Sequence, residues 1–495
     1  MVAVAIASGV VGFTTTAITV GTRGMAVDLS LSTAQLGWVV NAYLVSAAAL
    51  ALVGGRMGDV VGRVRTFDLG LVVFAVASVV GVFAPGFWVL VGARIGQGVG
   101  AAMILPASIS VIAEYSTKGR EDVGFRWRGL VYASSFAIGP LIGGVLTDWF
   151  TWRWIFVFDA ALVVAAGVVA MPLLNHPGRG THRPTRDFVG ASLVAMLLAL
   201  VVVFAEHLAD RSFLSVATAV AIAVCLVLVV LVVRHERRAD HPLVHPFIIR
   251  DRTVLGANIA TLGASLGMLS LLYFFNLFAQ SAATFSDGAV SVIAALVPFV
   301  LSMTLCALFA HWLGGRLGPR WPVTVGLVMM AAGFAWLTTA TGDTTKTALL
   351  APLALAGIGT GIANGSLTGV AFLHLPAGRL NEAAGWNSLA RFLGSAMALA
   401  VGTATFLSVA ATGMGGASPV PSGGDPFDLA VAALDRDLSG PVLAATDAAT
   451  TERFTRTMGI TAVVLLVITV LSWWLLRPRP MAPVEPHAEP DARAT

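Results

Sequence analysis

Residues 36–65 read LGWVVNAYLVSAAALALVGGRMGDVVGRVR, an apolar run followed directly by a short basic segment. The apolar part, 36–54, approaches the roughly 20 residues that a helix needs to cross the hydrocarbon core of a bilayer. The segment after it carries Arg56, Arg63 and Arg65, and basic residues of this kind collect in cytoplasmic loops. This stretch therefore predicts a membrane-spanning helix that ends at the cytoplasmic face.

The composition of the whole chain predicts the same class of protein. Of 495 residues, 57% are hydrophobic and 11% are charged, whereas soluble domains carry about 25% charged residues. This balance excludes a water-soluble globular protein. The net charge of +4 does not indicate nucleic-acid binding, because the basic residues are scattered between apolar runs instead of forming one face. Cys225 and Cys306 lie in apolar runs, so we expect no disulfide and no redox chemistry.

Apolar runs of about 18 residues or more define fourteen expected spans. They are 2–22, 36–54, 67–84, 87–113, 129–149, 153–173, 188–206, 213–233, 253–280, 288–312, 322–341, 347–370, 384–409 and 457–476. The first run has no basic segment before it and no small-residue cleavage site, so we expect a retained span and not a signal peptide. A start upstream of Met1 stays open.

Basic residues also predict the orientation of the chain. If the N-terminus is cytoplasmic, the inner loops and the C-terminal tail hold 21 of the 30 Lys and Arg residues, and the outer loops hold seven. The inner group includes the arginines of the loop 118–128, while Arg94 and Arg391 lie within spans. Because cytoplasmic loops collect these residues, we expect both termini to be cytoplasmic in a bacterial plasma membrane.

A short internal repeat divides the chain into two halves. The sequence GGRMG at 54–58 recurs as GGRLG at 314–318, each time at the end of a span. This repeat predicts a six-helix bundle over 1–173 and a second over 253–476, with an outer loop at 410–456. Residues 174–252 would hold cytoplasmic linkers and two extra helices, and 477–495 a cytoplasmic tail. Duplicated halves are typical of alternating-access transporters.

The loop after the second span carries a motif. Its glycines permit positive φ and close helix approach, while Asp59 can pair with an arginine or cap the next helix. The run resembles the signature loop of the major facilitator superfamily, G-x-L-a-D-r-x-G-r-k-r. The matching residues are Gly55, Gly58, Asp59, Gly62, Arg63 and Arg65, with Met57 for Leu and with Val60 and Val64 at usually basic positions. The resemblance implies a conformational latch at Gly55, Asp59, Gly62 and Arg63; the alternative is a loop that only fixes topology.

The fourth span contains a buried arginine. Residues 94–102 read RIGQGVGAA, and arginine at mid-helix costs about 2.5–3.5 kcal/mol, so Arg94 should face a polar interior and have a partner. The run resembles the family's fourth-helix motif R-x-x-q-G-x-g-a-a. This resemblance implies a role for Arg94 in proton coupling, against the alternative of a structural role. No strand precedes the glycines, so they do not indicate a dinucleotide site.

The fifth span combines small residues with a proline. Ser135, Gly139 and Gly143 recur every four residues, which makes a flat face for close packing, and Pro140 lets the helix bend. The run through Gly144 resembles the fifth-helix motif g-x-x-x-G-P-x-x-G-G of the exporting antiporters in this superfamily. The resemblance implies that Gly139, Pro140, Gly143 and Gly144 seal the two bundles against leak; ordinary small-residue packing is the alternative.

Three further stretches, 152–159, 242–247 and 387–394, resemble the 14-helix drug:proton antiporter branch. The resemblance implies an all-α major facilitator fold of two six-helix bundles plus two extra central helices. It also implies export of drug-like or natural-product molecules in exchange for protons. That branch usually has an acid in its first helix, where this chain reads GFTTT at 12–16. Asp159, in place of the usual asparagine, is therefore the candidate proton carrier.

Other polar residues within or near spans are candidates for a substrate cavity or for bonds between helices. They are Asn41, Tyr43, Asn258, Asn276 and Arg391. His235, His241 and His245 lack the ligand spacing of a metal site, and we expect no cofactor, no metal and a monomer that contacts substrate, protons and lipid. A metabolite importer and a polytopic membrane enzyme remain as alternatives, although the sequence shows no nucleophile constellation or paired carboxylates.

Overall fold

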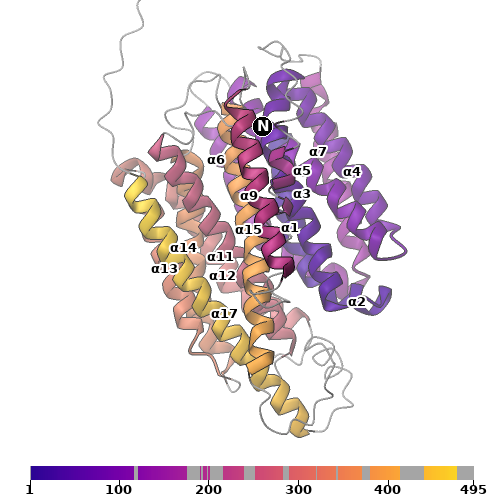
Figure 1. Ribbon diagram of the computed structural model, residues 1–495, viewed down its shortest axis with the longest axis vertical. Coiled ribbons are helices and arrows are strands. Elements are labelled where there is room, and N and C mark those ends of the chain that lie inside the picture. Colours follow the sequence, from indigo (N-terminus) through magenta and orange to yellow (C-terminus); the bar gives the residue numbers. More distant parts are fainter. Residues whose placement is uncertain are drawn as a thin grey trace, which may run out of the picture.

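The computed structural model describes residues 2–115, 121–174, 190, 193–197, 199–200, 216–238, 251–281, 289–318, 320–341, 344–370, 380–412 and 440–476. Within these ranges the regular secondary structure is helical and contains no strand (Figure 1). The helices are α1 (Val2–Val20), α2 (Thr22–Leu29), α3 (Thr33–Val60), α4 (Arg63–Val82), α5 (Phe87–Tyr115), α6 (Glu121–Trp149), α7 (Arg153–Leu174), α9 (Val216–Glu236), α11 (Arg252–Ser281), α12 (Ala289–Leu317), α13 (Arg320–Leu337), α14 (Lys346–Val370), α15 (Leu380–Thr412) and α17 (Gly440–Leu475).

The expected spans agree well with these helices. Each expected span except 188–206, which lies largely outside the described residues, overlaps one described helix. By length and apolar composition, nine helices of the described ranges can cross a membrane, or ten if the bent α6 is one span. The protein is therefore an all-α polytopic membrane protein, and the described residues do not by themselves reach fourteen spans.

Part of the range expected as an outer loop is helical. We placed it at 410–456, but α17 begins at Gly440, so the last part of that range is helical. Charged residues such as Glu452 and Arg456 interrupt the apolar pattern there, although the segment is held by the buried Phe454, whose ring stacks on Phe278 of α11 with 4.6 Å between centroids.

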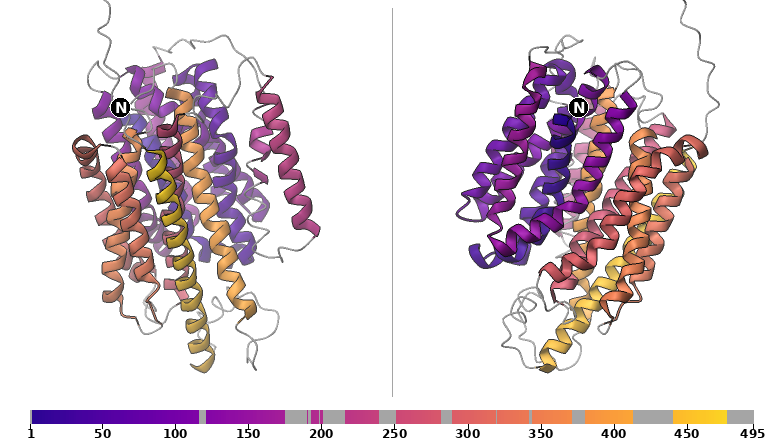
Figure 2. Two further views of the ribbon diagram at one scale, coloured as in Figure 1. Left: turned by 60° about the vertical axis from the view of Figure 1, so that its left-hand side comes forward. Right: turned by 180° about the vertical axis from the view of Figure 1, so that it is seen from behind.

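The helices form two groups with the same order of packing. In the first group α1 packs against α6, and both α3 and α4 pack against α5. In the second, α11 packs against α15, and both α12 and α13 pack against α14. The two groups lie side by side (Figure 2) and meet where α3 packs against α15 and where α6 packs against α12. By the order of packing, α3 corresponds to α12 and α6 to α15, so the two contacts are equivalent.

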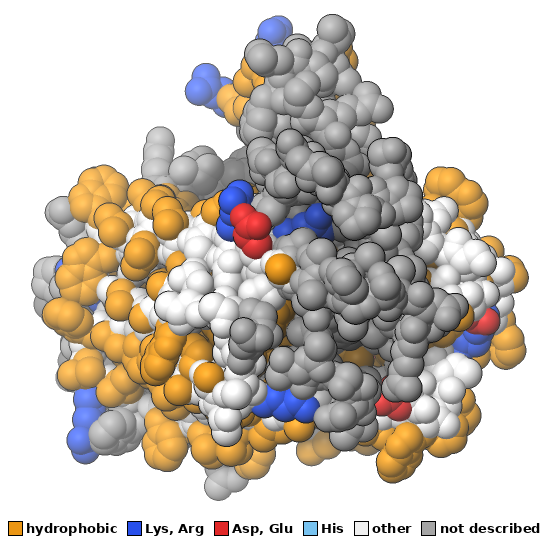
Figure 3. All heavy atoms as spheres, turned by 90° about the horizontal axis from the view of Figure 1, so that it is seen from below, with side chains coloured by type: hydrophobic (Ala, Val, Ile, Leu, Met, Phe, Trp, Pro, Cys, Tyr) orange, Lys and Arg blue, Asp and Glu red, His pale blue; other side chains and the backbone are white. Residues whose placement is uncertain are grey.

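The perimeter of the molecule is apolar. Viewed along the helices, hydrophobic side chains gather around the rim of the face in Figure 3. Exposed valines on the outer faces of α4, α7 and α17 belong to this surface, among them Val76, Val168 and Val463. A continuous exposed apolar surface of this kind fits contact with lipid. The helix α9 lies at the edge of the molecule and is mostly exposed (Figure 2), although Leu228 is buried and Val232 packs against the core.

The repeat of the GGR segments has a different register in the structure. Gly58 is helical and α3 continues to Val60, whereas the chain turns at Gly62, the N-cap of α4, with φ 107°. In the second half the chain turns at Gly318, directly after α12, with φ 74°. A positive φ at a helix end favours glycine, which lacks the Cβ that would clash. Gly62 and Gly318 therefore share a positive φ, whereas Gly58 is helical.

Glycines also set how closely α3 approaches its neighbours. A Cβ on Gly54 would overlap the carbonyl oxygen of Ala102 on α5. A Cβ on Gly385 of α15 would lie 3.6 Å from the Gly55 Cα, so α3 and α15 meet almost backbone to backbone across the boundary between the groups. The contact of α3 with α5 needs glycine at position 54, because a methyl group added there has no space.

We expect Gly54→Ala to lower the thermal stability of the purified protein, because overpacking a tight contact costs about 1–3 kcal/mol. Gly37→Ala in the same helix is the matched control, since a Cβ there meets no atom within 4 Å. Its melting temperature should be unchanged or higher, because alanine is the better helix former. Equal melting temperatures for the two variants in detergent would contradict the packing of α3 on α5.

Candidate functional site

Asp159 of α7 is a buried carboxylate held by two other helices. Its side chain is 1% exposed. One oxygen accepts a hydrogen bond from the Thr14 hydroxyl on α1, and the other accepts from Gln97 Nε2 on α5 at 3.1 Å. A buried charge is tolerated only where hydrogen bonds replace water. Asp159 thus lies against the part of the first helix where the resemblance leads us to expect an acid.

Gln97 connects Asp159 to the arginine of the same helix. Its Oε1 accepts a hydrogen bond from Arg94 Nη1 at 2.8 Å, and its Nε2 also donates to the Ser78 hydroxyl on α4 at 2.9 Å. Positions three apart on a helix share one face, so Arg94 and Gln97 point the same way. Arg94 and Asp159 form no direct ion pair, and the neutral amide lies between the two charges.

Arg94 is anchored from the opposite side by α3. Its Nε donates to the Val39 carbonyl oxygen at 3.1 Å, and its guanidinium carbon lies 4.5 Å from the centre of the Tyr43 ring. Its Nη2 has no hydrogen-bond partner among the described residues. The Tyr43 hydroxyl donates to the Val11 carbonyl oxygen of α1 at 3.1 Å. Tyr43, an expected cavity residue, therefore belongs to the surroundings of Arg94.

The structure brings the two expected coupling residues into one network and adds others. Thr14, Ser78 and Gln97 complete it, and the sequence did not single out their roles. The spacing of Gln97 after Arg94 was a usable signal, because a polar residue three positions from a buried arginine is placed to bind it. Thr14 and Ser78 gave no such signal, since their partners lie far away in the sequence.

Thr16 compensates for the proline in α6. Pro140 lacks an N–H, so the carbonyl oxygen of Phe136, four residues earlier, has no helical donor. The Thr16 hydroxyl of α1 donates to that oxygen at 3.0 Å. The segments of α6 on either side of Ala137 are bent by 45°. The bend that Pro140 permits is thus fixed by a side chain of a neighbouring helix.

The glycine face of α6 contacts α1. A Cβ on Gly139 would lie 3.0 Å from the Phe13 carbonyl oxygen, and one on Gly143 would lie 2.9 Å from that of Ala17. Gly144 is buried. We expected this face to seal the two bundles, but at Gly139 and Gly143 it packs within the first group, because α1 offers the flat backbone that these small residues fit.

The basic loop has one described ion pair. Arg63, at the start of α4, contacts Glu114 at the end of α5 with 3.2 Å between Nη1 and Oε2. Asp59 belongs to α3, and its side chain lies outside the described part of the chain. Glu114 was not singled out from the sequence, although an acid at the same membrane face as the basic loop was a usable signal. The latch itself stays a prediction.

The remaining cavity candidates have different surroundings. Asn41 and Asn258 are buried on α3 and α11. Asn276 Nδ2 donates to the Thr19 carbonyl oxygen at 3.1 Å and so joins α11 to α1 across the boundary between the groups. Arg391 Nη1 donates to Asn364 Oδ1 of α14 at 3.1 Å. Asn276 and Arg391 thus make the bonds between helices that the sequence analysis left as the alternative.

Arg128 is buried, although we counted it with a cytoplasmic loop. The helix α6 begins at Glu121, well before the expected 129, and Arg128 is 6% exposed. Its Nε donates to the Ser108 hydroxyl of α5 at 2.8 Å. The sequence did not predict this extension of the helix, because a search for runs of apolar residues ends at the charged residues in the first turns of α6.

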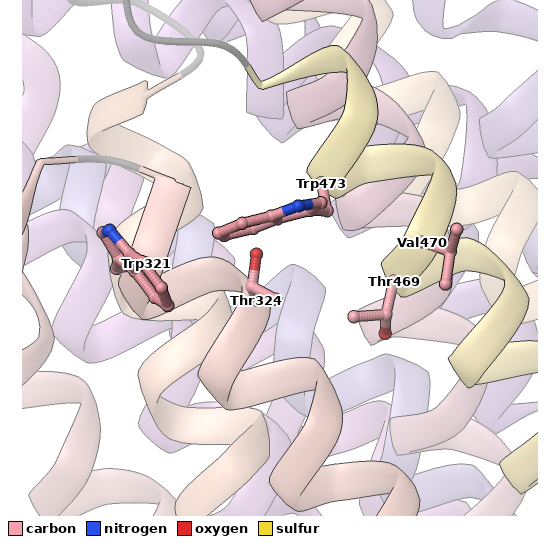
Figure 4. A pocket seen from close by; sticks show the side chains of 5 residues that line it. All are labelled: Trp321, Thr324, Thr469, Val470 and Trp473. Atoms are coloured by element: carbon pink, nitrogen blue, oxygen red, sulfur yellow. The ribbon is translucent and has the colours of Figure 1, made fainter.

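A surface pocket of about 300 Å³ lies between α13 and α17 (Figure 4). Its lining consists of Trp321, Thr324, Thr469, Val470 and Trp473. The Arg320 guanidinium lies 3.3 Å from the centre of the Trp473 ring. Tryptophan and arginine together are typical of anchors at the membrane interface. This pocket contains none of the expected site residues.

The described residues contain no group of three or more His, Cys, Asp or Glu side chains that could hold a metal ion. His235 belongs to α9, while His241 and His245 lie outside the described residues.

Thr16→Val should lower thermal stability, because it leaves the Phe136 carbonyl oxygen buried without a donor, at a cost of about 1–3 kcal/mol. In a Pro140→Ala background the same change should cost less, since alanine restores the helical N–H. Thr19→Val is the control, because that hydroxyl bonds within its own helix, to the Thr16 carbonyl oxygen. Melting temperatures of the double-mutant cycle measure the coupling, and additive effects would contradict it.

Comparisons with known proteins agree with this architecture. The Major Facilitator Superfamily profile matches residues 2–399. The chain is 30% identical to the cephamycin export protein of Amycolatopsis lactamdurans, over 82% of this chain and 83% of that one. It is 30% identical to a puromycin resistance protein of Streptomyces alboniger, over 91% and 86% of the two chains.

A multidrug efflux pump of Mycolicibacterium smegmatis is 27% identical, over 76% of this chain and 73% of that one. Among solved structures, a bacterial homologue of the lysosomal transporter Spinster superposes with a TM-score of 0.63 at 15% identity, covering 96% of each chain. A human organic anion transporter gives 0.59 at 14% identity, covering 96% of this chain and 98% of that one. Since the family profile and the relatives each span most of its length, the chain belongs to the major facilitator superfamily.

Proposed function

We propose that this protein exports drug-like or natural-product molecules across the bacterial cytoplasmic membrane in exchange for protons. The observation that carries the proposal is the buried Asp159 carboxylate, which is held by neutral donors and separated from Arg94 by an amide. The names of relatives support the direction, because they include a cephamycin export protein, a puromycin resistance protein and a multidrug efflux pump. The halves would alternate access to a central substrate site.

The two oxygens of Asp159 differ in how they can take up a proton. The Thr14 hydroxyl can turn from donor to acceptor, whereas the Gln97 Nε2 group can only donate. A proton on the oxygen beside Thr14 therefore keeps a hydrogen bond there, while a proton on the other oxygen would oppose the N–H of Gln97. We assign proton loading to the oxygen that faces Thr14, with the hydroxyl reversing its bond.

Protonation also changes the environment of Arg94. The ionised carboxylate attracts the guanidinium through Gln97, and the neutral acid does not. Arg94 would then keep its contacts with Val39, Tyr43 and Gln97 but lose this attraction, so the protonation of Asp159 alters how firmly α5 and α7 are joined. A proton that moves down 100 mV releases about 2.3 kcal/mol, enough for roughly fifty-fold accumulation of a neutral substrate in one-for-one exchange.

The cytoplasmic ends would open and close at the basic loop. The contact of Gly55 with Gly385 joins the two groups there, and access from the cytoplasm requires this contact to separate. Arg63 and Glu114 tie the start of α4 to the end of α5 on the same side. We propose that Gly55, Asp59, Gly62 and Arg63 form the latch, with Glu114 as the described partner of Arg63.

Asp159→Asn should abolish transport driven by a pH gradient, because an amide cannot exchange a proton at this position. Asp68→Asn is the matched control, since Asp68 lies in α4 and makes no contact with the Asp159 network among the described residues. Proteoliposomes loaded with the cationic dye tetramethylrosamine or the anionic dye fluorescein measure efflux with and without the gradient. Gradient-dependent efflux in Asp159→Asn would show that another group carries the proton.

The Arg63–Glu114 pair is tested by exchange of charge. Arg63→Glu should slow efflux by placing two acids together, and the double variant Arg63→Glu with Glu114→Arg should restore much of the rate. Initial rates of dye efflux and the expression level of each variant are the measurements. If the double variant is as slow as Arg63→Glu, the pair has no part in the latch.

The direction of transport distinguishes export from the alternative of a metabolite importer. Everted membrane vesicles that contain the protein should accumulate dye when their lumen is acidified, because protons leave as the dye enters. A host that lacks its own pumps should become less susceptible to toxic substrates when it expresses the chain. Dye accumulation only in right-side-out vesicles would favour import.

A further inference from the structure

A second buried cluster lies where the two groups of helices meet. Arg128 and Tyr132 are on α6 of the first group, and Arg391 is on α15 of the second. The three side chains are 6%, 6% and 7% exposed. The guanidinium carbons of Arg128 and Arg391 lie 5.9 and 5.0 Å from the centre of the Tyr132 ring. Two cations from opposite halves thus share one aromatic ring.

The positive charge of this cluster is not balanced by the described residues. The hydrogen-bond partners of Arg128 and Arg391 are the neutral Ser108 hydroxyl and the Asn364 amide oxygen. No described carboxylate contacts either arginine. The Tyr132 hydroxyl has no hydrogen-bond partner in the described part of the chain. Buried arginines without an acid are costly in a membrane protein, so such a cluster is expected where a ligand supplies the missing charge.

We propose that Arg128 and Arg391 bind an anionic group of the transported molecule, such as a carboxylate, with the Tyr132 hydroxyl as an additional donor. This inference rests on the proposed transport function and names the charge of its substrate class. Guanidinium groups suit the role because their planar N–H donors match the two oxygens of a carboxylate. Each arginine uses one described hydrogen bond within the protein, which leaves further donors for a ligand.

The position of the cluster gives the ligand an effect on conformation. Without an anion, the two like charges repel each other across the boundary between the groups. A bound anion reverses this, because it attracts both arginines and draws α6 and α15 together. A ligand shifts a conformational equilibrium only by binding one state better than the other. A site divided between the two halves is complete only when they are close together, so the anion binds that arrangement better.

The anion cluster and the proton network use separate residues. Asp159, Gln97 and Arg94 belong to α5 and α7 of the first group, whereas Arg391 is contributed by the second. Of these charged residues, only Arg391 comes from the second group. Binding of the anion and loading of the proton can therefore be altered independently by substitution.

Fluorescence polarisation with purified full-length protein tests the site directly. Fluorescein, which is anionic and carries a carboxylate, is the probe, and tetramethylrosamine is a cationic dye on the same xanthene scaffold. Arg128→Gln and Arg391→Gln should each weaken fluorescein binding at least tenfold and leave tetramethylrosamine binding equal or tighter. Tyr132→Phe should weaken fluorescein binding several-fold. The control Arg237→Gln removes one positive charge from the exposed end of α9 and should change neither affinity.

Thermal stability separates a ligand site from a structural one. Removal of an unbalanced buried charge should leave the melting temperature unchanged or higher in the glutamine variants. If a glutamine variant fails to fold, Arg128→Lys and Arg391→Lys keep the charge and should retain part of the fluorescein affinity. Fluorescein that does not bind the wild type, or that binds every variant equally, overturns the proposal.

Dye transport by the same variants in liposomes distinguishes the proposed anion site from the proposed proton-coupled export. Arginine-dependent fluorescein binding without transport in a pH gradient would support the anion site and contradict proton-coupled export. Gradient-driven transport of tetramethylrosamine together with fluorescein binding that ignores both arginines would support export and overturn the anion site. Gradient-driven fluorescein efflux that is lost in both glutamine variants is the result expected if both proposals hold.

Discussion

The interior of a bilayer offers no water to a buried charge, so every ionised side chain in a span must find its partners within the protein. Asp159 and Arg94 meet this requirement through Gln97 and not through direct contact. Two unit charges 4 Å apart attract by about 4 kcal/mol at an effective dielectric constant of 20. That exceeds the roughly 2.3 kcal/mol that one proton releases over 100 mV. In the proposed mechanism, the amide between the charges weakens their attraction so that a proton can switch it.

The first helix connects most of the features that matter for transport. Thr14 holds the buried acid, Thr16 completes the hydrogen bonding of the bent α6, and the Thr19 carbonyl oxygen receives Asn276 from the second group. Three threonines within two turns thus link three different elements. A change in the protonation of Asp159 reaches α1 directly through Thr14. From α1 it has physical contacts both to the bent helix and to the other half.

The boundary between the groups combines close backbone contact with buried charge. Gly55 and Gly385 let α3 and α15 approach almost backbone to backbone, while Arg128 and Arg391 meet around Tyr132. The first contact favours a closed boundary through packing, and the like charges of the second oppose it. We propose that this balance of attraction and repulsion gives the boundary two arrangements, as alternating access requires.

The sequence by itself determined the class of protein, nearly all of the described spans and the need for a partner at Arg94. The length of an apolar run and the free-energy cost of a buried arginine depend only on the local sequence. They can therefore be inferred without knowing which helices are neighbours. The pairing of Asp159 with Thr14, the glycine face of α6 against α1 and the burial of Arg128 beside Arg391 were decided only by the tertiary structure. Helices that are apolar on all sides show no preferred face in their sequence. Which face meets which neighbour therefore depends on packing between residues of different helices, such as Thr14 and Asp159, which lie 145 positions apart.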